Sequence, residues 1–109
     1  MSPLSPEQPT TGEDPEALPK PRFSLGQVVA TPGALEVLQQ AERDPTEFIA
    51  RHVVGEWGDL EDEDKQENEL SVEQGFRILS AYNLDDNTKI WIITERDRSA
   101  TTILLPSEY

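Results

Sequence analysis

The chain has 109 residues, no cysteine and a formal net charge of −13, from 22 acidic and nine basic side chains. This is the length of a single domain, and the lack of cysteine excludes disulfides, thiolate nucleophiles and cysteine–zinc sites. The negative charge argues against direct binding to nucleic acid or anionic membranes, because both attract Lys and Arg. The sequence contains no bilayer-spanning apolar run and no signal-peptide pattern, so we expect a cytoplasmic protein.

Residues 1–22 differ in composition from the rest of the chain. They hold six of the nine prolines and only four apolar residues. So little apolar surface cannot offset the entropy lost on ordering. We therefore predict a disordered, acidic, Pro-rich tail over residues 1–22 and one small domain over residues 23–109.

Turn residues and apolar spacing divide the domain into seven elements. Thr31 and Asp44 each precede a proline, which is typical of a helix start. Asp59 could cap a third helix, and Gly75 would end it. Later segments alternate apolar and polar residues, which indicates strands. Strands are predicted at residues 23–30, 76–84, 88–94 and 99–105, and helices at residues 32–42, 45–54 and 59–74.

These elements predict an α+β domain with a mainly antiparallel sheet of about four strands. The last three strands would form a meander, with turns at residues 85–87 and 95–98. Three helices lie between strands one and two, and we expect them to cover one face of the sheet. An exposed sheet edge would make a homodimer possible.

The predicted third helix has no apolar residue between Leu60 and Leu70. A helix that is polar all round is weakly held. We expect it to be anchored near its ends by Trp57, Leu60, Leu70 and Val72, with most of its surface in water. Trp57, between two glycines, is either an exposed interaction anchor or part of the core.

Acidic residues are concentrated in and around this helix. Nine of the twenty-one residues from Gly55 to Gly75 are acidic, and Lys65 is the only base among them. Residues four apart on a helix lie about 6 Å apart, close to the phosphate spacing along one nucleic-acid strand. The face is therefore either a solvated surface or a partner-binding one. The candidate partner-binding residues are Trp57, Asp59, Asp62, Glu63, Glu67, Glu69 and Glu73.

Three ordered stretches carry a family resemblance. They run from Leu25 to Leu35, from His52 to Glu69, and from Ile93 to Pro106. Together they resemble a family of short bacterial proteins usually labelled hypothetical or plasmid-related, with Glu56 where those proteins tend to have Asp. The resemblance implies a bacterial, cytoplasmic protein that could be carried on mobile DNA, and it transfers no catalytic residue.

Catalytic and metal sites find less support. His52, the only histidine, could act as a general base oriented by Asp59 or Glu56, or it could be a structural residue. The acidic run lacks the glycine that a calcium loop needs at its sixth position, so no metal site or cofactor is predicted. The alternative function is a small hydrolase or nuclease that uses His52 with Asp59 or Glu95.

The preferred hypothesis is a non-enzymatic interaction protein. Its acidic helix would bind a protein with a basic surface. In the sharper form it mimics nucleic acid and inhibits a DNA-binding protein. Charge reversal on the helix should then abolish binding, whereas loss of His52 should not.

Overall fold

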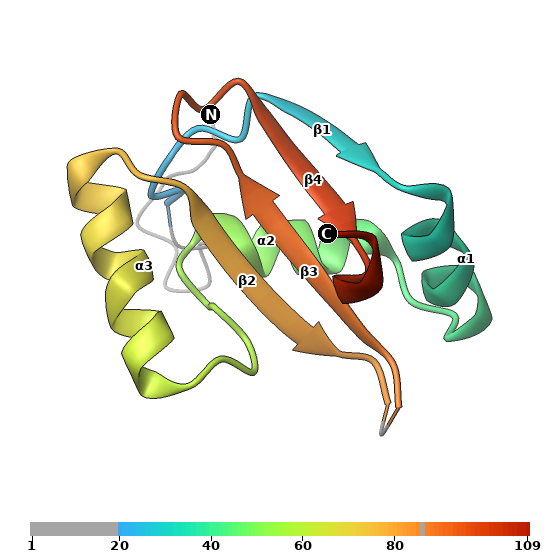
Figure 1. Ribbon diagram of the computed structural model, residues 1–109. Coiled ribbons are helices and arrows are strands. Elements are labelled where there is room, and N and C mark those ends of the chain that lie inside the picture. The colour runs from blue at the N-terminus through green and yellow to red at the C-terminus, as the bar shows by residue number, and fades with distance from the viewer. Residues whose placement is uncertain (1–19, 86) are drawn as a thin grey trace, which may run out of the picture.

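The computed structural model describes residues 20–85 and 87–109 (Figure 1). Residues 1–19 of the tail predicted over residues 1–22, and Asp86 in the predicted turn, lie outside the described residues. The protein has the predicted α+β fold and element order. Its elements are β1 (Gln27–Ala30), α1 (Pro32–Gln40), α2 (Pro45–Val53), α3 (Asp62–Gln74), β2 (Ile78–Asn83), β3 (Lys89–Thr94), β4 (Ala100–Leu104) and the 3-10 helix η2 (Pro106–Glu108).

The sheet has the strand order β1-β4-β3-β2. The meander of β2, β3 and β4 is antiparallel, as predicted. The sheet as a whole is mixed, because β1 lies parallel to β4, with Gln27 opposite Ala100. A parallel pair needs a long connection, and the helices together with the other two strands supply it.

Three of the four residues predicted at helix ends take the predicted role. Thr31 accepts a hydrogen bond from the backbone N–H of Ala34 at 3.1 Å, and Asp44 accepts one from Thr46 at 2.9 Å. Gly75 ends α3 in the left-handed conformation, at a φ of 79°. The prediction that Asp59 caps α3 is wrong, since the capping position is Glu61.

The main core lies on one face of the sheet. Tyr82, Ile90, Ile92 and Ile103 are buried there against Ala34 and Leu38 of α1 and Phe48 of α2. Figure 1 shows α2 crossing behind the strands and α3 standing beside β2 at the edge of the sheet. The prediction that the helices cover one face therefore fits α1 and α2, whereas α3 takes a different position.

The outer edge of β2 is hydrogen bonded by the segment that leads into α3. The N–H of Ala81 donates to the carbonyl of Trp57 at 3.2 Å, and the carbonyl of Ala81 accepts from the N–H of Asp59 at 2.6 Å. The Asp59 carboxylate then accepts from the N–H of Asn83 at 2.8 Å. This use of Asp59 explains why it does not cap α3.

A side chain of α3 completes the same edge. Asn68 donates from Nδ2 to the carbonyl of Leu79 at 2.7 Å and accepts from its N–H at 3.2 Å. Asn68 and Ser71 are the buried residues of α3, whereas Leu70 is 51% exposed. The expectation of an apolar anchor at Leu70 is therefore wrong, because the helix docks on strand backbone, which a polar amide can pair.

Candidate functional site

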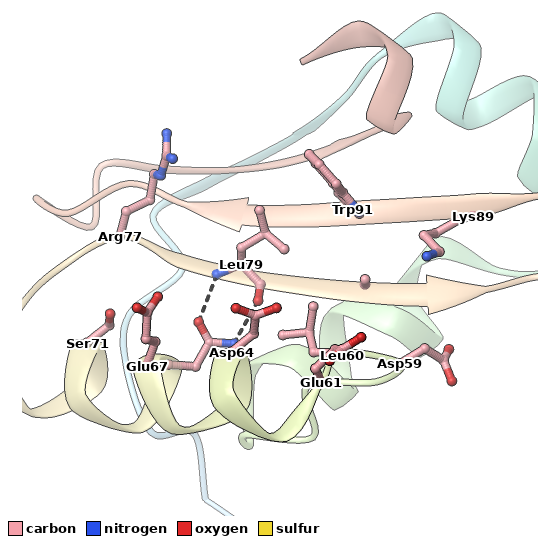
Figure 2. A pocket seen from close by; sticks show the side chains of 12 residues that line it. Asp59, Leu60, Glu61, Asp64, Glu67, Ser71, Arg77, Leu79, Lys89 and Trp91 are labelled. Carbon is pink, nitrogen blue, oxygen red and sulfur yellow. Dashed lines mark hydrogen bonds between the residues drawn. The ribbon is translucent and has the colours of Figure 1, made fainter.

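A cleft of about 510 Å³ separates α3 from the face of the sheet that α2 does not cover (Figure 2). One wall of the cleft is formed by a side of α3, and helical spacing explains which residues lie there. Asp64, Glu67, Asn68 and Ser71 follow one another at intervals of three, one and three residues, so they share one side of α3. Figure 2 shows Asp64 and Glu67 extending from the helix toward the sheet. The cleft thus has an acidic wall.

The rest of the cleft comes from the sheet and the residue that precedes β2. Leu79 and Ala81 of β2 and Trp91 of β3 provide an apolar floor, and Arg77 and Lys89 stand at opposite ends of it (Figure 2). Trp91 is half-buried, and its ring meets Tyr109 edge-on at 5.6 Å between centroids. The cleft therefore combines anionic, apolar and cationic parts.

Ser71 adds a polar group at one end of the cleft. Ser71 is only 8% exposed, and Figure 2 shows its hydroxyl directed toward the sheet. No hydrogen bond of this hydroxyl joins it to another residue drawn in Figure 2. A buried hydroxyl without a partner is unfavourable, so a ligand atom at this position would be stabilised.

The predicted partner-binding residues occupy three different environments. Asp62, Glu63 and Glu73 are exposed on the side of α3 away from the sheet, as their angular positions relative to Asn68 require. Glu67 is also exposed but borders the cleft. The fold uses the other three: Asp59 pairs with β2, and Trp57 and Glu69 meet each other.

Trp57 is 4% exposed, which removes it from any surface that touches a partner. Its ring stacks on Phe23 with centroids 6.2 Å apart, and its Nε1 donates to Glu69 at 2.9 Å. Arg22 forms two hydrogen bonds with the same carboxylate, at 2.7 and 2.9 Å. Hydrogen bonds from Arg22 and Trp57 lower the pKa of Glu69 to about 2. Glu69 therefore has a structural role.

His52 is fully buried within a chain of hydroxyl groups. Its Nδ1 lies 2.6 Å from Ser80 Oγ, and its Nε2 lies 2.9 Å from Thr94 Oγ1. Thr94 Oγ1 is 2.7 Å from Thr101 Oγ1, which donates to the carbonyl of Leu25 at 2.7 Å. Among the described residues, neither ring nitrogen has a carboxylate partner.

The direction of these hydrogen bonds follows from the chain. Because the Leu25 carbonyl can only accept, Thr101 donates to it and must accept from Thr94. Thr94 then accepts from Nε2–H of His52, and Nδ1 accepts from Ser80. Burial lowers the pKa of His52 to about 3, so the ring is neutral near pH 7. A neutral ring with both nitrogens occupied lends no support to a general base acting with Asp59 or Glu95.

Sequence reasoning missed part of the cleft. The candidate partner-binding acids were selected because they form rows along the helix. Glu61 and Asp64 were therefore not among them. The available signal was the spacing of Asp64, Glu67, Asn68 and Ser71, which marks a polar stripe facing a polar edge. The floor residues could not be found because their placement depends on strand pairing.

Comparisons of the chain with protein-family models, with curated proteins and with solved structures find no match. Among residues 20–85 and 87–109, no helix combines the length and apolar composition needed to cross a bilayer. Within that part of the chain, no three His, Asp or Glu side chains gather as a metal site would require.

Proposed function

We propose that this protein binds a basic surface of another protein through the acidic residues of α3 and its capping position. The observation that carries the proposal is a set of exposed carboxylates at Glu61–Asp64, Glu67 and Glu73. Among the described residues, none of them forms an ion pair, since the three ion pairs present join other acids to Arg22, Arg43 and Arg51. The proposal includes no catalytic step, cofactor or metal.

The charge arrangement supports a cationic partner. Glu63 and Glu67 lie one helical turn apart, and like charges at this spacing destabilise a helix by a few tenths of a kcal/mol. Lys65 is the only base on α3. A concentrated negative field speeds encounter with a positive surface and disfavours negative partners.

A nucleic-acid-binding protein is the partner class that we propose within this function. The exposed acids Asp62, Glu63, Glu67 and Glu73 remain available for mimicry of a phosphate row, whereas Asp59 and Glu69 are engaged within the fold. The resemblance to plasmid-related bacterial proteins fits an inhibitor of a DNA-binding protein in the cytoplasm of the host.

Affinity capture with the complete chain tests this function. The test variant carries Asp62→Lys, Glu63→Lys and Glu67→Lys. The matched control carries Glu36→Lys, Glu42→Lys and Glu95→Lys, which are exposed acids outside α3. Both variants receive the same change in net charge, so a difference between them reports the location of the binding surface.

We expect the wild-type chain and the control to retain a nucleic-acid-binding protein from a bacterial lysate until salt releases it, and the α3 variant to lose it. Duplex DNA should then displace the purified partner, because both would occupy one basic surface. Identical capture by the two variants, or no capture at all, would refute the proposed function. Capture that DNA does not affect would refute mimicry alone.

A further inference from the structure

We infer that the cleft between α3 and the sheet is a binding site for a single arginine side chain presented by a peptide segment of a partner. This inference rests on the proposed function and assigns it a place and a ligand. It separates two of the acids that line the cleft, Asp64 and Glu67, from the outward acids Asp62 and Glu63. The cleft combines an acidic wall, an apolar floor, a buried hydroxyl and a basic residue at each end of the floor.

The acidic wall provides the charge for a guanidinium group. Asp64 and Glu67 lie one turn apart and extend into the cleft (Figure 2). Neither carboxylate forms an ion pair with any residue in 20–85 or 87–109. Arginine carries several N–H donors in a rigid planar arrangement, which suits two neighbouring carboxylates better than a point charge does.

The floor suits the rest of an arginine side chain. Leu79 and Ala81 offer apolar surface to its methylene groups, which bury readily while the charged end stays near water. Trp91 offers an aromatic ring within the same cleft, and a guanidinium near such a ring gains from the ring quadrupole. An acidic patch without this floor would give a solvated surface instead.

The buried hydroxyl of Ser71 points to a ligand independently of the acids. The residue is 8% exposed, lines the cleft and has no hydrogen-bond partner among the side chains drawn around it. Burying a hydroxyl without a partner is unfavourable. A guanidinium N–H paired with Glu67 could donate a second hydrogen bond to this oxygen.

The two basic residues of the cleft limit the number of cations that it can bind. Arg77 and Lys89 lie at opposite ends of the floor (Figure 2), and they would repel a continuous basic run laid along it. One arginine at the acidic wall, with neutral or acidic neighbours toward the sheet, avoids this repulsion. The site should therefore prefer an isolated arginine to a polyarginine run.

The test uses NMR on the complete chain, with a blocked peptide that contains one arginine among glycine, serine and alanine. The matched peptide carries citrulline, which keeps the shape of arginine and lacks its charge. We expect the arginine peptide to shift the indole N–H signal of Trp91 and the amide of Ser71. The indole of Trp57 serves as an internal control, because it is buried and bound to Glu69.

Two isosteric variants locate the effect. Asp64→Asn with Glu67→Gln should weaken binding of the arginine peptide about tenfold, equivalent to about 1.4 kcal/mol. Asp62→Asn with Glu63→Gln removes the same charge from the outward side of α3 and should change binding by less than about twofold, because exposed charges are well screened.

Equal binding of the citrulline peptide, no shift at Trp91, or equal loss in the two variants would each overturn the inference. Applying the same two variants to partner capture separates it from the proposed function. Capture that depends on the outward pair alone refutes the cleft and leaves the proposed function standing. If neither variant weakens capture, and charge reversal on α3 also leaves capture intact, then both the cleft inference and the proposed function are refuted.

Discussion

Replacing His52 with glutamine tests the buried hydrogen-bond chain in the core. Glutamine can donate to Thr94 and accept from Ser80 but does not titrate. His52 is the only histidine in the chain, so no other imidazole contributes to the pH dependence. In the wild-type protein, protonation of Nδ1 would make it a donor, and the hydroxyl of Ser80 would lose its acceptor.

The size of the effect follows from the lowered pKa. Burial moves the pKa of His52 from 6.5 to about 3 in the folded protein. The unfolded chain therefore binds a proton below about pH 6.5 that the folded protein does not bind until about pH 3. The contribution of His52 to the free energy of unfolding is therefore fully present above pH 6.5. Below pH 6.5 this contribution falls by about 1.4 kcal/mol for each unit of decreasing pH. The expected loss is about 2 kcal/mol at pH 5.

Urea unfolding of both proteins between pH 7 and pH 5 measures this directly. The free energy of unfolding of the wild type, relative to the His52→Gln variant, should fall by about 2 kcal/mol over that interval. The comparison cancels the contribution of the 22 carboxyl groups, which both proteins share. Parallel pH curves would refute a neutral, desolvated His52, whatever the stability of the variant at pH 7.

Two further predictions concern the edge of β2. Asn68→Ala should lower the free energy of unfolding by about 2 kcal/mol, because the N–H and carbonyl of Leu79 lose their partners. Urea unfolding and hydrogen exchange of the Leu79 amide measure this effect, and no change in either would contradict the prediction. Gly58→Ala should destabilise the fold more than Gly75→Ala, since both glycines have positive φ but only a Cβ at Gly58 would collide with the carbonyl of Ala81. Thermal unfolding compares the two, with about 1 kcal/mol expected for the unobstructed Gly75, and equal effects would contradict the close approach.

Local signals predicted the elements well, because their causes are local. The prolines after Thr31 and Asp44 begin two helices in the structure, and Gly75 ends the third. Alternation over residues 76–84 indicated a strand, and β2 forms there over Ile78–Asn83. Each signal acts over a few residues, so it survives whatever the tertiary arrangement is.

Signals that depend on distant partners were less predictive. Asp59 looked like a helix cap from its neighbours, yet Asn83 claims its carboxylate. Trp57 could be either exposed or buried, and its ring lies under Phe23 and beside Glu69. The direction of β1 beside β4 also depends on how the chain returns through the helices, which no short pattern records.

The sequence by itself determined the concentration of acids, the helix and strand boundaries within a few residues, and the α+β order. Only the tertiary structure decided which of the acids serve the fold and which remain exposed. Charge is a property of composition, but its use depends on what lies within hydrogen-bonding distance. Glu69 meets Arg22 from forty-seven residues away, whereas Asp64 and Glu67 face the open cleft.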